Sequence, residues 1–204
     1  TLNGEGLQHE DGHSPLLAAT NPAVVSYDPA FGFELGHIVR DGLRRMYGEN
    51  SENVFYYLTV YNEPYAQPAE PEKLDVDGLL KGMYLYSPAK SKHKKKVQLL
   101  ASGVAVNWAL EAQKLLDEHW GISASVWSVT SWNEIRRDGL AIDRHNLLNP
   151  NDKKSAFITK KLDGHEGPVV AVSDYMRQVQ DQIAPWVENP FISLGTDAVS
   201  YTHL

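Results

Sequence analysis

The chain has 204 residues, with 19 basic and 26 acidic side chains and therefore a formal net charge of −7 at neutral pH. The absence of cysteine excludes disulfide frameworks, thiolate zinc sites and cysteine nucleophiles. A hydrophobic fraction of 42% is enough to form a core, while no apolar run approaches the roughly 20 residues that a membrane span needs. We therefore expect a soluble, cytoplasmic globular chain, and its acidic balance disfavours nucleic acid as a partner, as the lack of a span disfavours a membrane.

The first part of the chain predicts a strand, a helix and a second strand. Residues 23–27 (AVVSY) are mostly β-branched and apolar, which indicates a buried strand. Asp28 followed by proline is a typical helix N-cap, and apolar residues then recur at helical spacing until Gly48. Residues 53–61 (NVFYYLTVY) are rich in aromatic and β-branched side chains and give the strongest strand prediction of the chain.

A cluster of five lysines and one histidine occupies residues 90–96 (KSKHKKK). Such a cluster could bind an anion or a nucleic acid, but it is more typical of a solvated linker. No aromatic residue interleaves with the lysines, and the apolar pattern restarts after them. We therefore interpret residues 90–96 as a linker between two domains.

The second part of the chain again alternates strands and helices. Short apolar runs predict strands at residues 97–101, 122–129, 168–173 and 191–194. Helical spacing predicts helices at residues 105–116, 131–148 and 174–186. Ser131 and Glu134 form the pattern of a capping box at the start of the second of these helices. Strands that alternate with helices in this way favour parallel βαβ units.

The first 14 residues carry three glycines and no apolar periodicity, which predicts a loop. Residues 9–13 (HEDGH) match the H-E-x-x-H signature of zinc hydrolases, whose chemistry needs both histidines on one face of a helix. The turn pair Asp11-Gly12 and the following Pro15 disfavour a helix here. A zinc hydrolase that uses His9, Glu10 and His13 is therefore the weakest functional interpretation.

Interpreted as a loop, the same segment places two imidazoles and three carboxylates within nine positions: Glu5, His9, Glu10, Asp11 and His13. Such a set of groups can hold a histidine pKa near neutrality and so can move protons. The alternative is a polar surface loop whose groups titrate normally.

Several long motifs follow one another along nearly the whole chain. They are TLNGEGLQHEDGHS, SYDPAFGFELGHIVRDGLRRMYG, NVFYYLTVYNEPYAQPA, VQLLASG, SVWSVTSWNEIRRDG, VAVSDYMRQV and SLGTD. In sequence and order they closely resemble the homodimeric bacterial pyruvate dehydrogenase family, in its decarboxylating, acetyl-transferring component. This is a thiamine diphosphate-dependent family with a transketolase-like architecture.

The resemblance implies an enzyme that decarboxylates pyruvate and reductively acetylates the lipoyl group of dihydrolipoamide acetyltransferase. It assigns His9 to positioning the substrate and handling protons during acetyl transfer, with Glu5 supporting it by hydrogen bonding or charge. Asp11 and His13 lie in the same loop and are secondary candidates. The partners implied are pyruvate, the lipoyl-bearing acetyltransferase and a second copy of the chain in a homodimer.

The sequence departs from the family in its cofactor motif. The family binds magnesium and the diphosphate through a G-D-G motif followed by asparagines, whereas Asp163-Gly164-His165 lacks both the first glycine and the asparagines. We therefore expect thiamine diphosphate and magnesium to be bound mainly by an N-terminal portion that this sequence lacks, and we assign no cofactor-binding or metal-binding residue here. The fragment alone should be inactive.

The resulting fold prediction is α/β, with a partial pyrimidine-binding domain of mixed or parallel sheet followed by a transketolase-type C-terminal α/β domain. Residues 1–89 form the C-terminal part of the pyrimidine-binding domain, residues 90–96 the linker and residues 97–197 the C-terminal domain. Residues 198–204 (AVSYTHL) depart from the family and form a tail to which nothing is transferred. A non-catalytic α/β module for dimerisation and docking remains the alternative function.

Overall fold

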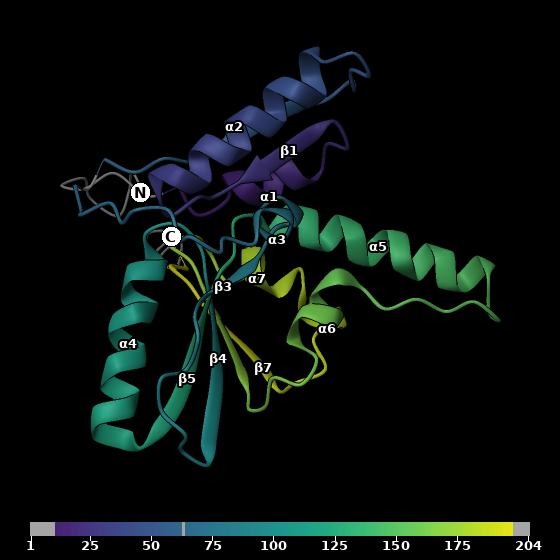
Figure 1. The fold of residues 1–204 in the computed structure, drawn as a ribbon. Coiled ribbons are helices and arrows are strands. Elements are labelled where there is room, and N and C mark those ends of the chain that lie inside the picture. The colour runs from purple at the N-terminus through teal and green to yellow at the C-terminus, as the bar shows by residue number, and fades with distance from the viewer. Residues whose placement is uncertain (1–10, 63, 198–204) are drawn as a thin grey trace, which may run out of the picture.

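The computed structural model describes residues 11–62 and 64–197, which form an α/β structure with two sheets (Figure 1). The smaller sheet pairs β1 (Val24–Tyr27) with β2 (Phe55–Leu58) in parallel. The larger sheet has the strand order β3-β5-β4-β6-β7, in which β3 is antiparallel to β5 and the other neighbours are parallel. Its strands are β3 (Tyr84–Ser87), β4 (Lys95–Ala101), β5 (Ile122–Ser128), β6 (Val169–Val172) and β7 (Phe191–Leu194).

Helices cover both faces of the larger sheet, and the small sheet lies beyond its upper end (Figure 1). The helices are α1 (Ser14–Ala19), α2 (Gly32–Tyr47), α3 (Val76–Lys81), α4 (Ala105–Trp120), α5 (Trp132–Leu148), α6 (Phe157–Leu162) and α7 (Gln178–Asp181). Helix α4 packs on β4 and β5, while α5 contacts α6 and β1. Among the described residues, no helix is both long and apolar enough to cross a membrane.

Side chains of β4 alternate between the two apolar clusters on opposite faces of the larger sheet. Val97, Leu99 and Ala101 belong to the apolar cluster beneath α4, whereas Leu100 belongs to the cluster beneath α5 and α6. Because successive side chains of a strand point to opposite faces, one strand supplies both cores. The central strands β4 and β5 are buried over most of their length, as their apolar runs predict, whereas the edge strand β7 is partly exposed.

Most of the predicted helices and strands are confirmed, and several of their bounds lie close to the predicted ones. Strand β7 has the predicted limits, and α5 ends at the predicted residue, with Ser131 Oγ accepting from the backbone N of Glu134 at 3.0 Å. The strand predicted over residues 53–61 is shorter, since β2 covers Phe55–Leu58. Lys95 and Lys96 form the first two residues of β4, and β3 lies in the larger sheet. The division of the chain into domains stays a prediction.

Two helix predictions are wrong. Asp28 is not the N-cap of α2, which begins at Gly32, because the Asp28 carboxylate is buried and bonded to residues distant in the chain. The helix predicted over residues 174–186 is interrupted: α7 has only four residues, and a short 3₁₀ helix covers Ala184–Trp186. Pro185 has no N–H for a continuous helix, and its ring clashes with the preceding turn.

Four short elements were not predicted: α1, α3, α6 and β3. Each has only four to six residues, too few for a periodic apolar pattern to stand out. The fold class is nevertheless the one expected from the sequence, an α/β arrangement with parallel and mixed sheets.

A fully buried carboxylate, Glu34, joins the small sheet's helix to the larger sheet. Its Oε1 accepts from the hydroxyls of Tyr84, at 2.7 Å, and Ser128, at 2.6 Å. Its Oε2 accepts from the backbone N–H groups of Ala30, at 2.6 Å, and Phe31, at 3.1 Å. Burial raises the pKa of Glu34, and these four donors oppose that rise. The start of α2 is thereby fixed to β3 and β5.

We predict that Glu34→Ala lowers the free energy of unfolding by roughly 3 kcal/mol, because four buried donors lose their acceptor. Urea unfolding followed by circular dichroism measures the change. The matched control is Glu49→Ala at an exposed position, which should change stability by less than about 0.5 kcal/mol. Equal effects of the two substitutions would contradict the role given to Glu34.

Candidate functional site

The described chain begins with the end of the acidic and histidine-containing loop. Asp11 Oδ1 accepts from the backbone N–H of His13 at 3.2 Å and from that of Ser14 at 2.9 Å. Burial of Asp11 favours its neutral form, but the hydrogen bonds from Ser14 and His13 outweigh it and lower the pKa of Asp11. Asp11 is therefore a charged residue that fixes the entry to α1.

This loop end is attached to the C-terminal half of the chain. The carbonyl of Gly12 accepts from the backbone N–H of Met176 at 3.2 Å. Beside this contact lies a hollow of about 430 Å³ between the loop end and the segment around α7. Its lining combines the loop with charged and polar groups of the C-terminal half: Gly12, His13, Met176, Arg177, Gln178, Asp181 and Asp197.

Two of the lining residues, Arg177 and Asp197, form an ion pair. Arg177 Nε donates to Asp197 Oδ2 at 2.6 Å, and its backbone N–H donates to Asp197 Oδ1 at 3.0 Å. The hydrogen bond from the Arg177 backbone has the largest effect on the pKa of Asp197 and lowers it, and the side chain of Arg177 lowers it further. The backbone N–H of Thr196 also donates to the carbonyl of Tyr175 at 3.0 Å. The SLGTD motif thus lies against the same segment as the loop.

The structure describes only part of the predicted site. Glu5, His9 and Glu10 lie outside the described residues. His13 lines the hollow, whereas Asp11 precedes the lining residue Gly12 and does not line it. Arg177 and Asp197 were not predicted as site residues, although both fall within motifs that carry the family resemblance. Their sequence distance from the loop gave no reason to place them there.

The buried Asp28 carboxylate, which directly follows β1, accepts hydrogen bonds from three hydroxyl groups. Its Oδ1 accepts from Thr59 Oγ1 at 2.6 Å and from the Tyr61 hydroxyl at 2.9 Å, and its Oδ2 accepts from Ser102 Oγ at 2.6 Å. Burial raises the pKa of Asp28, which the three hydroxyls partly offset. Ser102 in turn accepts from the indole N–H of Trp132 at 2.9 Å. This network joins the carboxyl ends of β1 and β4.

The turn after β4 is the place in the described chain that most resembles an anion cradle, but it is filled. Gly103 has a φ of +53°, and its N–H donates to the carbonyl of Asp28 at 3.1 Å. A Cβ at this position would overlap the Tyr61 hydroxyl and the Asp28 carboxylate. The described residues here do not fit a diphosphate, so we interpret the turn as a packing turn.

The described residues also lack the features of a zinc site. Asp11, Gly12 and His13 are not helical, because α1 begins only at Ser14. No group of three or more potential metal ligands occurs within residues 11–62 and 64–197. His9 and Glu10 lie outside these residues.

Comparison with known families accounts for both parts of the chain. Residues 82–198, more than half of the chain, match the family model described as "Transketolase-like TK C-terminal domain". The chain belongs to this transketolase-like family. Residues 1–68 match a second family model, described as "Pyruvate dehydrogenase E1 component middle domain". The expected fold class and the resemblance stated from the sequence motifs are thereby confirmed.

Curated relatives of this transketolase-like chain carry the name "Pyruvate dehydrogenase E1 component". The protein of Mycolicibacterium smegmatis is 58% identical over 203 residues, and that of Mycobacterium tuberculosis is 54% identical over 203 residues. The Escherichia coli protein is 43% identical over 199 residues. These matches cover 97–99% of the chain but only 22% of each relative. The chain thus spans about a fifth of the length of the relatives it matches.

Solved structures resemble the transketolase-like chain in fold. A split-gene transketolase aligns with 98% of this chain and 57% of its own, at a TM-score of 0.62 and 18% identity. The transketolase from Leishmania mexicana aligns with 93% of this chain and 23% of its own, at a TM-score of 0.56 and 16% identity. The curated relatives favour neither the zinc hydrolase nor the purely structural module as the function of the chain.

We predict that Asp28→Asn changes the pH dependence of stability. Because burial raises the folded pKa of Asp28 above 3.8, the folded state binds more protons than the unfolded state between the two pKa values. The stabilising contribution is fully present below the unfolded pKa and is lost as the pH rises through the folded pKa. Relative to Asp28→Asn, the native protein should therefore lose stability as the pH rises above about 4.

Urea unfolding of both proteins over a pH series measures this difference. A difference that is independent of pH, or one that favours the native protein increasingly as the pH rises, would contradict the assignment of a raised pKa to Asp28.

Proposed function

We propose that this chain is the C-terminal portion of a pyruvate dehydrogenase E1 component. The whole protein would decarboxylate pyruvate and reductively acetylate the lipoyl group of dihydrolipoamide acetyltransferase. The observation that carries this proposal is the 58% identity over 203 residues to a relative of that name. The order of the two family matches, first a middle domain and then a C-terminal domain, supports the same assignment.

The cofactors belong to the same proposal. Thiamine diphosphate would supply the reactive carbon centre for decarboxylation, with magnesium holding its diphosphate, and both would be bound mainly by residues outside this chain. The filled turn at Ser102 and Gly103 supports this division, because it leaves no room for a diphosphate there. A homodimer in the cytoplasm completes the proposal.

The contribution of this chain to the chemistry would come from its loop. His9 would position the substrate and handle protons during acetyl transfer, with Glu5 supporting it by hydrogen bonding or charge. Asp11 and His13 are secondary candidates. The attachment of the loop end supports this role, since Asp11 accepts from the backbone N–H of Ser14, the first residue of α1, and the Gly12 carbonyl accepts from the backbone N–H of Met176. A proton-handling group needs such fixed surroundings to act at a defined distance.

Arg177 and Asp197 would act as positioning residues in this proposal. Their two hydrogen bonds, of 2.6 and 3.0 Å, join the SLGTD motif to the segment that holds the loop. Because the two charges neutralise each other, the pair is suited to holding a surface in place rather than to binding an anionic substrate.

In the full-length protein, we predict that His9→Ala lowers the rate of lipoyl acetylation by about 100-fold, the usual scale for losing a general acid or base. A coupled assay of NADH formation in the reconstituted complex measures the rate. His119→Ala, at an exposed position near the end of α4, is the matched control and should leave the rate unchanged. Full activity of the His9→Ala protein would refute the assignment of His9.

The division of the cofactor site gives a second prediction. Thiamine diphosphate with magnesium should leave the melting temperature of the isolated chain unchanged, because a ligand raises it only by binding the folded state. The full-length protein under the same conditions should show a clear rise. If the isolated chain also melts at a higher temperature with the cofactor, the placement of the cofactor site outside the chain is wrong.

A further inference from the structure

Tyr175 lies where three parts of the chain meet: the loop end, the SLGTD motif and the network around Asp28. Its carbonyl accepts from the backbone N–H of Thr196 at 3.0 Å. The next residue, Met176, donates its backbone N–H to the carbonyl of Gly12 at 3.2 Å. The backbone of residues 175 and 176 is therefore bonded both to the motif and to the loop end.

The side chain of Tyr175 fixes this backbone to the junction of the two sheets. Its ring is buried in the apolar cluster beneath α5 and α6. Its hydroxyl interacts with the hydroxyls of Thr59 and Tyr61, which donate to Asp28 Oδ1 at 2.6 and 2.9 Å. Tyr175, Thr59 and Asp28 also line one small cavity together. The side chain is thus held at its apolar body and at its polar tip.

Gly195 of the SLGTD motif lies directly against the same backbone. A Cβ at Gly195 would overlap the carbonyl of Tyr175 and would come within 2.8 Å of the backbone N of Arg177. Because backbone atoms cannot move aside as a flexible side chain can, a larger residue at 195 would displace residues 175–177. Gly195 and the Tyr175 side chain therefore fix one segment, the first from the motif and the second from the junction.

We propose that Tyr175 is a positioning residue, whose anchored side chain holds the loop end, and through it His9, in place for acetyl transfer. This inference rests on the proposed function, in which His9 handles protons. Gly12 is three residues from His9 in the sequence, so a shift of its partner Met176 changes the path of the loop. Met176 lines the hollow and Tyr175 does not, so Tyr175 acts through the backbone rather than on the substrate.

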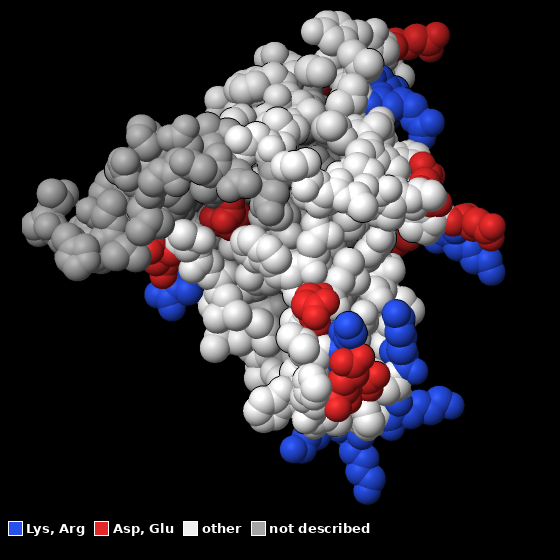
Figure 2. All heavy atoms as spheres, turned by 90° about the vertical axis from the view of Figure 1, so that its left-hand side faces the viewer, with Lys and Arg blue, Asp and Glu red and all other residues white. Residues whose placement is uncertain are grey.

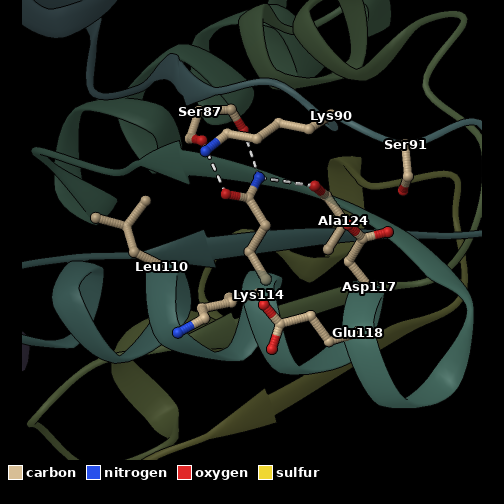
Figure 3. Close-up of a pocket in the computed structure, with 9 residues that line it drawn as sticks. Ser87, Lys90, Ser91, Leu110, Lys114, Asp117, Glu118 and Ala124 are labelled. Carbon is tan, nitrogen blue, oxygen red and sulfur yellow. Dashed lines mark hydrogen bonds between the residues drawn. The ribbon is translucent and has the colours of Figure 1, made fainter.

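Gln113 offers a matched control, because it is also buried and hydrogen-bonded but lies far from the loop end. Its Nε2 donates to the carbonyls of Ser87, at 3.1 Å, and Ala124, at 2.8 Å (Figure 3). Ala124 is the third residue of β5, so these bonds lie near the amino end of that strand. Asp117 and Glu118 line the hollow beside Gln113, and Figure 2 shows side chains of both charges gathered at the lower end of the molecule.

Hydrogen exchange of the full-length protein tests the attachment without reference to the reaction. Tyr175→Phe removes only the hydroxyl, and it should speed exchange of the Met176 amide about fivefold, because the contact with Gly12 opens more often. Gln113→Leu leaves two buried carbonyls without this donor, so it should lower the melting temperature at least as much, yet leave exchange at Met176 unchanged. Native exchange at Met176 in Tyr175→Phe would overturn the proposal.

The kinetics of the reconstituted complex test the consequence for the reaction. Tyr175→Phe should lower kcat of lipoyl acetylation about fivefold and leave KM for pyruvate unchanged, because the loop acts in acetyl transfer. Decarboxylation with ferricyanide as the electron acceptor should stay close to the native rate. Gln113→Leu should change none of these quantities. Equal losses of acetylation in the two variants would mean a general effect of stability and would overturn the proposal.

Double variants show whether Tyr175 acts through His9. Residues that act as one unit give losses that do not add, so Tyr175→Phe should lower the rate of the His9→Ala protein by less than about twofold. Gly195→Ala displaces the same backbone and should also slow acetylation in the native protein, but add little to His9→Ala. If the full loss from Tyr175→Phe persists in the His9→Ala protein, the proposal is wrong.

The same measurements distinguish this inference from the proposed function. If the full-length native protein does not turn over pyruvate, the proposed function fails, and the role of Tyr175 in acetyl transfer fails with it. If the native protein is active and Tyr175→Phe has both native exchange at Met176 and the native acetylation rate, only the role of Tyr175 fails.

Discussion

The arrangement of this protein depends on two buried carboxylates whose hydrogen bonds join the region of the small sheet to the larger sheet. Asp28 binds the hydroxyl of Ser102 at the end of β4, and Glu34 binds that of Ser128 at the end of β5. A buried carboxylate is costly unless its oxygens are hydrogen-bonded, so each fixes the relative position of the groups around it. Together they place the end of β1 and the start of α2 over the carboxyl ends of two parallel strands.

That placement explains why residues from the two ends of the chain meet. The carboxyl edge of parallel strands is where α/β proteins commonly place their sites, and here the loop end at Gly12 bonds to Met176 beside that edge. The Arg177–Asp197 pair then holds the SLGTD motif against the same segment. The hollow is thus assembled by tertiary contacts around a fixed junction, in agreement with a site built from the family's separate motifs.

The sequence predicts elements whose signals are local. The apolar run of β7 and the Ser131 cap of α5 are examples, because strand propensity and a side-chain cap act within a few residues. Asp28 shows the limit, since a residue with every local feature of an N-cap instead bonds a hydroxyl 74 residues away. The loop motif predicts Asp11 and His13 as secondary site candidates, which stays a prediction, whereas no local pattern marks Arg177 or Asp197 as neighbours of the loop end.

The long sequence separation of these contacts has a consequence for folding. The Glu34–Ser128 bond spans 94 residues, and closing so long a loop costs entropy that is recovered only after β5 has joined the sheet. The start of α2 therefore cannot reach its final position before the larger sheet forms. We therefore expect the two sheets to unfold together, although they match different domain families.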